Sequence, residues 1–290
     1  MKTYNDVYLG ARKRLKASGI ESYNLEARLI VAKAAGKTPE HLLRDINLYV
    51  TDEFVNNAQE LIERRCEGEP VAYILGEWSF LGHPIEVNHD VLIPRIDTEI
   101  TASVAIEIMR KAGGKGRVLD LCTGSGCIGV AMAASLPDCR FVLGDISTEA
   151  LQVARSNVLK NGVVSRCICV QSDALTKPPI LMGEFNMIVS NPPYIPSGDM
   201  ETLDRDVRCY EPALALDGGE DGLKFYRSVV TKWKRVLKEN GYLVFECGIG
   251  QAEDIAKMMK ENGFTDIEIE KDTLGIDRVV AGRIENPVSF

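Results

Sequence analysis

Apolar residues at helical spacing predict a small helical bundle at the front of the chain. A four-residue spacing relates Val7, Ala11 and Leu15, and a second series with the same spacing comprises Phe54, Ala58 and Ile62. Such spacing places apolar side chains on one face of a helix. Glycines and polar residues between the two series are typical of helix ends and caps, at Gly19, Gly36 and Thr51-Asp52. We therefore expect residues 1–72 to form an all-α domain.

Alternating apolar and polar positions follow and predict a β-hairpin connector over residues 73–96. Apolar residues mostly alternate with polar or small ones at Trp78, Phe80, Ile85, Val87, Val91 and Ile93. The segment Gly82-His83-Pro84 supplies the predicted turn.

Short apolar strands alternate with helices over residues 97–290. The predicted strands are Arg117–Cys122, Arg140–Gly144, Cys167–Gln171, Met187–Ser190, Tyr242–Glu246, Asp266–Ile269 and Arg278–Ala281. The predicted helices are Ile128–Ser135, Ser147–Asn161, Gly222–Lys238 and Ala252–Glu261. This α/β alternation is typical of a doubly wound, Rossmann-like sheet with helices on both faces.

Composition and charge restrict the class of protein. Apolar residues make up 45% of the chain, and no run approaches the roughly 20 apolar residues of a bilayer-spanning helix. The first residues show no apolar signal core, and the eight cysteines lack paired metal-binding spacing. The net charge of −8 lacks the basic footprint of a nucleic-acid binder. We expect a cytoplasmic monomer with free thiols, no metal, and neither a membrane nor a nucleic acid as partner.

A glycine loop joins the first of these strands to its helix, with the sequence Asp120-Leu121-Cys122-Thr123-Gly124-Ser125-Gly126. Its glycines match the GxGxxG pattern, and Asp145 follows about 20 residues later, where an acidic residue holds the ribose hydroxyls of a dinucleotide. Asp145 would serve S-adenosylmethionine equally well. The Asp120 carboxylate opposes a pyrophosphate but suits a ligand that carries an ammonium group and a sulfonium. The loop therefore favours S-adenosylmethionine.

A second cofactor contact is expected at Asp173 and Ala174, directly after the third strand. The Asp173 side chain would accept from the adenine amino group, and the Ala174 N–H would donate to the adenine ring. An Asx turn is the structural alternative for Asp173, and a solvated helix cap is the alternative for Asp145.

The quartet Asn191-Pro192-Pro193-Tyr194 ends the fourth predicted strand. Its prolines remove two N–H donors, and the residue before a proline is driven into an extended conformation. The Asn191 side-chain oxygen and the Pro192 carbonyl would accept both hydrogens of a planar –NH2 group, while Tyr194 offers a ring face. Such acceptors bind more strongly as the nitrogen becomes positive, so the quartet predicts methyl transfer to a planar nitrogen. An ordinary Asn-Pro turn is the alternative.

These motifs resemble those of class I methyltransferases, and four further segments resemble one family among them, the release factor glutamine methyltransferases (HemK/PrmC family). The segments are Glu69-Pro70-Val71-Ala72-Tyr73-Ile74-Leu75-Gly76, Phe80-Leu81-Gly82, Val91-Leu92-Ile93-Pro94-Arg95-Ile96-Asp97-Thr98-Glu99 and Tyr210-Glu211-Pro212-Ala213-Leu214-Ala215-Leu216-Asp217-Gly218-Gly219. Together with the motifs they extend over nearly the whole chain.

The resemblance implies methylation of the glutamine in the Gly-Gly-Gln motif of class 1 peptide chain release factors, with S-adenosylmethionine as donor and S-adenosylhomocysteine as product. Residues 1–72 would recognise the release factor, and residues 97–290 would form the catalytic domain. The implied cofactor-binding residues are Asp120, Leu121, Cys122, Thr123, Gly124, Gly126, Asp145, Asp173, Ala174 and Asn191. The implied substrate-binding residues are Asn191, Pro192, Pro193 and Tyr194, of which Asn191, Pro192 and Tyr194 would be catalytic.

Two residues depart from the pattern of this family. Cys122 stands in place of a glycine, and we expect its backbone to avoid positive φ. Ile96 stands in place of a proline, which leaves two interpretations of the segment Arg95–Glu99: a linker with a helix cap at Asp97 or Thr98, or a part of the site. Structural and catalytic roles stay equally open for Glu211.

Three other functions remain open at this point. A nucleic acid amino-methyltransferase would apply the same quartet to a flipped base. A nicotinamide-dependent oxidoreductase would use the glycine loop for a dinucleotide. A non-catalytic adaptor would use the helical domain to bind partners.

Overall fold

The helical spacing at the front of the chain produces five helices in the structure, a computed structural model that describes residues 1–285. They are α1 (Tyr4–Ala17), α2 (Tyr23–Ala34), α3 (Pro39–Arg44), α4 (Asp52–Cys66) and α5 (Val71–Leu75). The predicted apolar faces are confirmed, because Val7, Ala11 and Leu15 of α1 pack in one core with Ala58 and Ile62 of α4. The cap at Thr51 is confirmed as well, since its hydroxyl accepts from the Phe54 N–H at 3.2 Å.

These helices form one of two structural units. Unit 1 comprises Met1–Glu77 together with Asp204–Tyr210, and unit 2 comprises Trp78–Leu203 and the described chain from Glu211 onward. The segment Asp204–Tyr210 contains helix α9 (Arg205–Tyr210), and the Tyr210 hydroxyl donates to the Glu67 carbonyl oxygen at 3.5 Å. A segment distant in sequence therefore completes unit 1. The helical domain predicted from the sequence, residues 1–72, does not include this segment.

The predicted hairpin is present but shorter than expected. Its strands are β1 (Glu77–Phe80) and β2 (His83–Glu86), joined by a two-residue turn in which Leu81 and Gly82 have φ of 47° and 78°. Positive φ at both turn residues matches the right-handed twist of hairpin strands. The expected turn position of Pro84 is wrong, because Pro84 lies within β2. The expected strand continuation over residues 91–93 is also wrong, because that segment pairs with no strand.

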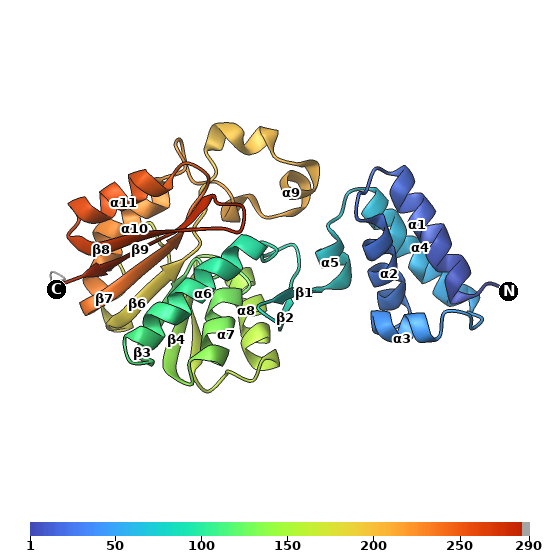
Figure 1. Cartoon of the computed structure of the whole chain (residues 1–290), viewed down its shortest axis with the longest axis horizontal. Helices are drawn as coiled ribbons and strands as arrows, with labels where there is room; N and C mark the ends of the chain where they lie inside the picture. The colour runs from blue at the N-terminus through green and yellow to red at the C-terminus, as the bar shows by residue number, and fades with distance from the viewer. Residues whose placement is uncertain (286–290) are drawn as a thin grey trace. The chain divides into compact units, whose positions relative to one another are not determined.

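Seven further strands form one mixed sheet in unit 2 (Figure 1). They are β3 (Lys115–Leu121), β4 (Asp138–Asp145), β5 (Cys167–Gln171), β6 (Phe185–Ser190), β7 (Leu237–Glu246), β8 (Phe264–Lys271) and β9 (Asp277–Ile284). The order across the sheet is β5-β4-β3-β6-β7-β9-β8, with β3 to β7 parallel and β9 antiparallel to both of its neighbours. The predicted doubly wound sheet is confirmed. The antiparallel edge could not be predicted, because alternation alone does not indicate strand direction.

Helices cover both faces of this sheet, as predicted (Figure 1). Helices α6 (Ile96–Lys111), α7 (Cys127–Ser135) and α8 (Thr148–Lys160) lie on one face, and α10 (Lys224–Lys232) and α11 (Ala252–Glu261) lie on the other. The predicted helix 222–238 is too long, because a 3-10 turn at Trp233–Val236 ends it and β7 begins at Leu237. Among the described residues, no helix is both long and apolar enough to cross a bilayer.

The strand order reverses between β3 and β6, and this reversal places the site. The chain runs outward from β3 to β4 and β5 and then returns to β6 on the other side of β3. Ligands of open α/β sheets bind beyond the carboxyl ends of the strands at such a switch point. Here these ends lead into the glycine loop and the Asn191–Tyr194 quartet, so the fold brings the two motifs to one edge of the sheet.

Replacement of Ile96 by proline should stabilise the protein. Ile96 is the first residue of α6 and is 78% exposed, and Arg95 before it is extended, with φ −98° and ψ 153°. Proline suits this helical position and restricts the unfolded chain, so I96P should raise the free energy of unfolding by about 0.4–1 kcal/mol. Urea titration measures the change. I96A removes the same side chain without restricting φ and serves as the control; a lower midpoint for I96P than for I96A would contradict the prediction.

Candidate active site

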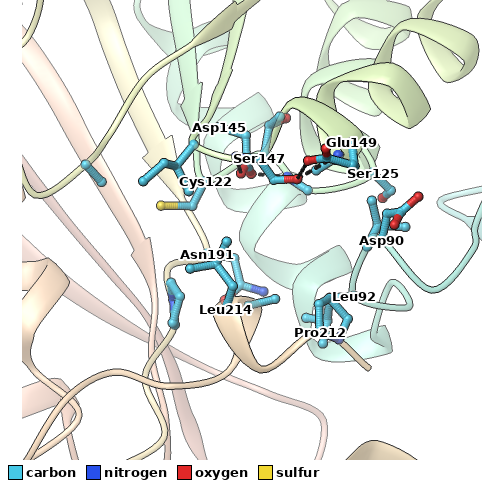
Figure 2. Close-up of a pocket in the computed structure, with 18 of the residues that line it drawn as sticks. Asp90, Leu92, Cys122, Ser125, Asp145, Ser147, Glu149, Asn191, Pro212 and Leu214 are labelled. Atoms are coloured by element: carbon cyan, nitrogen blue, oxygen red, sulfur yellow. Dashed lines mark hydrogen bonds between the residues drawn. The ribbon is translucent and has the colours of Figure 1, made fainter. Parts of the chain in front are cut away.

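A cavity of about 410 Å³ lies at this edge of the sheet (Figure 2). Its lining includes Cys122, Thr123 and Gly124 of the glycine loop, Asp145 at the end of β4, and Asp173 and Ala174 after β5. Asn191 and Pro193 of the quartet line it as well. In Figure 2, Asp145, Ser147 and Glu149 border one side of the cavity, and Leu92, Pro212 and Leu214 border the opposite side. The structure thus brings together most of the side chains predicted to bind cofactor and substrate.

Close packing shapes the glycine loop. The Thr123 N–H donates to the Gly144 carbonyl at 3.0 Å, and the Gly126 N–H donates to the Thr123 carbonyl at 2.8 Å. Gly126 has φ of +79°, and a Cβ there would lie 3.2 Å from the Ala154 Cβ. A Cβ at Gly129 would lie 2.9 Å from Leu143 Cγ. These glycines are needed because the start of α7 lies too close to β4 and α8 for larger residues.

The expectation that Cys122 avoids positive φ is wrong. Its φ is +62°, in the left-handed region, because the chain must turn sharply at this point between the end of β3 and the loop. This conformation costs a residue with a Cβ about 1–2 kcal/mol. Packing of the side chain against neighbouring core residues offsets part of that cost. Burial raises the pKa of the Cys122 thiol, so the group stays neutral beside the cavity.

Asp120 does not line the cavity and lies wholly inside the protein. Its Oδ2 accepts from the Thr123 hydroxyl at 2.5 Å and from the Gly129 N–H at 2.9 Å, while its Oδ1 is buried with no partner among the described groups. Burial raises the pKa of Asp120 to about 6. Leu121 and Gly126 also lie outside the lining. These three residues therefore shape the loop rather than line the cavity.

Asp145 faces the cavity with both carboxylate oxygens fixed by backbone groups. Its Oδ2 accepts from the Gly124 N–H at 2.9 Å, and its Oδ1 accepts from the Ser147 N–H at 3.0 Å. A carboxylate has about four acceptor positions, so each oxygen can accept one further hydrogen bond. This arrangement suits a pair of neighbouring hydroxyls. Burial raises the pKa of Asp145.

Asp173 and Ala174 border the cavity after β5. The Asx turn considered for Asp173 is present, because its Oδ1 accepts from the Leu175 N–H at 2.8 Å. The Ala174 carbonyl accepts from the Ser228 hydroxyl at 2.7 Å and from the Trp233 indole N–H at 3.1 Å. Both contacts hold this stretch of backbone against the cavity.

The charge of the lining distinguishes between ligand classes. It includes four acidic side chains, those of Asp90, Asp145, Glu149 and Asp173, and none of the described lining residues is a lysine or an arginine. A dinucleotide would place two phosphate charges among these carboxylates without a compensating cation. S-adenosylmethionine carries a sulfonium and an ammonium group, and both suit the acidic lining. This observation disfavours a nicotinamide-dependent oxidoreductase.

The quartet after β6 is held by contacts from three directions. The Asn191 amide Nδ2 donates to the Thr98 hydroxyl at 3.2 Å. The Tyr194 carbonyl accepts from Gln251 Nε2 at 2.9 Å, and a Cβ at Gly218 would lie 2.7 Å from the Tyr194 Cα. Pro192 and Tyr194 lie outside the lining of the cavity. Burial raises the pKa of Tyr194 to about 12, so its phenol stays neutral.

The open question about Arg95–Glu99 and Glu211 is resolved by an ion pair. Arg95 pairs with the buried Glu211 carboxylate, which also accepts from the Ile93 N–H at 3.3 Å. The pair joins two segments that line the cavity, residues 91–94 and 212–215. These contacts support the structural role considered for Glu211. The expected helix cap at Asp97 or Thr98 is wrong, because α6 begins after Arg95 without a side-chain cap.

Sequence reasoning missed Thr98 as a residue of the site. Thr98 is 3% exposed, lines the cavity and contacts Asn191. Thr98 and Asn191 are 93 residues apart in the chain, so no local pattern pairs them. The only signal was its place in a segment that resembles the family.

Comparison with known proteins assigns the chain to a family. Residues 6–76 match the model of the PrmC N-terminal domain, and residues 95–205 match that of the methyltransferase small domain. The chain is 40% identical over 281 residues to the release factor glutamine methyltransferase of Geobacter sulfurreducens, covering 94% of each protein. It belongs to the release factor glutamine methyltransferase family. The family member from Agrobacterium fabrum is 37% identical over 278 residues, covering 95% of each protein.

Solved structures agree with this assignment at the level of fold. The hMettl16 catalytic domain in complex with an RNA hairpin covers 89% of this chain with a TM-score of 0.57 and 16% identity. A methyltransferase from Pyrococcus furiosus covers 80% with a TM-score of 0.52 and 17% identity. The sheet is thus that of class I methyltransferases. As a member of the release factor glutamine methyltransferase family, the chain uses S-adenosylmethionine as its methyl donor.

The strain at Cys122 predicts an unusual order of stability among its variants. C122G should have a free energy of unfolding about 1 kcal/mol higher than C122A, because both lose the thiol but only alanine retains the cost of positive φ. Urea titration of the two variants measures the difference. Cys139, buried in β4, provides the matched control. There glycine should be less stable than alanine, and the same order at both positions would contradict the prediction.

Removal of the Asp145 carboxylate should weaken cofactor binding first. Hydrogen bonds from ligand hydroxyls to a carboxylate are strong, so D145A should raise the Kd for S-adenosylmethionine by at least about tenfold. Isothermal titration calorimetry measures the affinity. E149A removes an equal charge from an exposed lining residue and should change the Kd by less than about threefold. Unchanged affinity in D145A would contradict the ribose-binding role of Asp145.

Proposed function

We propose that this chain transfers a methyl group from S-adenosylmethionine to the side-chain nitrogen of the glutamine in the Gly-Gly-Gln motif of class 1 peptide chain release factors. The observation that carries the proposal is the placement of Asn191. Its amide lines the acidic cavity and is anchored through Nδ2 to Thr98, which leaves the side-chain oxygen available as an acceptor. Membership of the family supports the same reaction and the same class of substrate.

The chemical difficulty of this reaction is the weak nucleophilicity of an amide nitrogen. Its lone pair is delocalised into the carbonyl group, so the nitrogen must be oriented toward the methyl group rather than merely brought near it. The Asn191 side-chain oxygen and the Pro192 carbonyl are the two acceptors proposed for the two N–H bonds of the substrate amide. Pro192 and Pro193 contribute no competing N–H donors at this position.

The same two acceptors lower the barrier of the transfer. Bound S-adenosylmethionine supplies an electrophilic methyl group on a sulfonium. As the new C–N bond forms and the C–S bond breaks, the substrate nitrogen becomes positive and its N–H groups become stronger donors. Acceptors already in place need no reorganisation at that moment. The methylated nitrogen then loses one proton to a nearby acceptor or to water, so the chain needs no strong base.

We further propose that unit 1 recognises the body of the release factor, the role expected for residues 1–72. A cavity of about 450 Å³ in this unit is lined by apolar, basic, acidic and polar side chains of α1 and α4 and of the residues before α1, including Val7, Lys13, Asp6 and Gln59. Such a mixed surface suits a protein partner. The cytoplasmic location and the monomeric state stay predictions from the sequence.

The nucleic acid amino-methyltransferase is the weaker candidate. The quartet would suit an exocyclic amino group of a base, and the fold occurs in an RNA-bound catalytic domain. The acidic side chains of the cavity would repel the phosphates that accompany such a base. The relatives that match this chain over nearly their whole length are named release factor glutamine methyltransferases. A non-catalytic adaptor would not need the buried acceptors of the site.

Mass spectrometry of an unmethylated class 1 release factor tests the proposal directly. Incubation with this protein and S-adenosylmethionine should add one methylene, and peptide mapping should place it on the glutamine of the Gly-Gly-Gln motif. N191A should lower kcat by at least about 10²-fold, because one acceptor is lost from the transition state. Its affinity for S-adenosylmethionine should stay close to that of the unchanged protein. No added mass, with cofactor binding confirmed, would reject the substrate; loss of cofactor binding in N191A would reject the role of the quartet.

A further inference from the structure

A buried carboxylate lies behind Asn191, connected to it by one hydroxyl. Glu246 is the last residue of β7 and is 2% exposed. Its carboxylate receives side-chain hydrogen bonds from Thr98 and from Thr101, the latter at 3.3 Å. Thr98 also accepts from Asn191 Nδ2 at 3.2 Å. The three side chains form a continuous hydrogen-bonded series from Glu246 through Thr98 to Asn191.

The sheet explains why these groups meet. Strands β6 and β7 are parallel neighbours, with Ser190 opposite Phe245, so Asn191 and Glu246 follow directly at the same edge. Helix α6 packs against β6 and β7 and carries Thr98 and Thr101. Residues three apart on a helix project from the same side. An apolar residue at position 246 would satisfy this packing without burying a charge, which argues that the carboxylate has a use beyond packing.

The chemistry of the three groups gives the series a direction. An ionised carboxylate only accepts hydrogen bonds, so the single Thr98 proton must point at Glu246. Thr98 can then offer only a lone pair to Asn191, and Asn191 must present its NH2 group to Thr98. The Asn191 oxygen is consequently turned away from Thr98. Without the carboxylate, Thr98 would be free to donate to that oxygen, and the amide could adopt the opposite orientation.

We propose that Glu246, acting through the Thr98 hydroxyl, is a positioning residue that orients the Asn191 amide so that its oxygen accepts from the substrate. This inference rests on the proposed function, since it deepens the role assigned there to Asn191. Glu246 contacts neither substrate nor cofactor in this scheme. It prevents Asn191 from adopting the opposite orientation, in which the Asn191 NH2 group would face the NH2 group of the substrate amide.

The surroundings of Glu246 indicate how it responds to pH. Burial raises the pKa of Glu246 to about 7, and the hydrogen bonds from Thr98 and Thr101 oppose that shift. Asp97 on α6 raises the pKa further, whereas Arg278 on β9 lowers it. Other ionisable groups interact with it from neighbouring elements, namely Tyr194, Tyr226, Cys127 and Cys247, and burial raises the pKa of each of these four, so they stay neutral near pH 7. As the pH falls through about 7, Glu246 gains a proton that it can donate, so it no longer fixes the direction of the Thr98 hydroxyl.

Threonine variants separate positioning from packing. T98V keeps the shape of the side chain but removes its hydroxyl, and should lower kcat about 10²-fold with little change in the KM for the release factor. T98S keeps the hydroxyl and should restore most of the activity. T101V removes a hydroxyl that donates to the same carboxylate but does not contact Asn191, and its kcat should fall by no more than about fivefold. Equal losses in T98V and T101V would overturn the proposal.

Nuclear magnetic resonance tests the orientation without a release factor. In the unchanged protein, the side-chain NH2 resonance of Asn191, identified through its absence in N191A, should shift with pH around a midpoint of about 7. E246Q should abolish that shift and also the acidic limb of the kcat profile near pH 7. E246Q removes a buried charge, so its melting temperature at pH 8 should be at least that of the unchanged protein, which shows that it folds.

The outcomes of this experiment separate the two claims. If the Asn191 resonance does not shift with pH, or shifts identically in E246Q, the positioning role of Glu246 is overturned even if the protein methylates release factors. A resonance that titrates as expected in a protein without transferase activity would reject the proposed function while the link between Glu246 and Asn191 stands.

Discussion

Parallel pairing of β3 with β6 is the constraint on which the site depends. The two strands end in register, with Leu121 opposite Ser190, and the Ser190 hydroxyl donates to the Leu121 carbonyl at 2.5 Å across that edge. Every group of the site is placed relative to this junction. The chain must turn immediately after each of the two strands. This turn forces Cys122 into a left-handed conformation and directs Asn191 into the cavity.

In the proposed mechanism, the site works by charge and orientation rather than by an acid or a base. Its lining contains four acidic side chains and, among the described residues, no lysine or arginine, which favours a cofactor whose reactive end is positive. The acceptor that we propose for the substrate is a neutral amide, so its orientation has to be imposed by a neighbouring group. Thr98 imposes it in the structure, and the buried Glu246 behind Thr98 is the group that we propose sets the direction. Burial of that charge is costly, and such a cost is typical of functional sites.

Much of this protein could be predicted from its sequence because the informative patterns are local. Helical spacing predicted the core face of α1 and α4, and the alternation of strands and helices predicted the doubly wound sheet. Asp145 and Asn191 could be identified because Asp145 ends β4 and Asn191 directly follows β6, where the fold must place them at the ligand edge. Predictions failed where a residue adopts a turn conformation that its type disfavours, as Cys122 does. They also failed where the short helix α5 precedes the hairpin.

By itself, the sequence determined the class of the fold, the two motifs of the site and the chemistry they favour, because these depend on residue type and on spacing along one segment. Only the tertiary structure decided which distant groups meet. It placed Asp204–Tyr210 in unit 1, paired Arg95 with Glu211, and set Thr98 between Asn191 and Glu246. These contacts join segments separated by roughly 90 residues or more, and their partners are chosen by the order and direction of strands in the sheet, which no local pattern encodes.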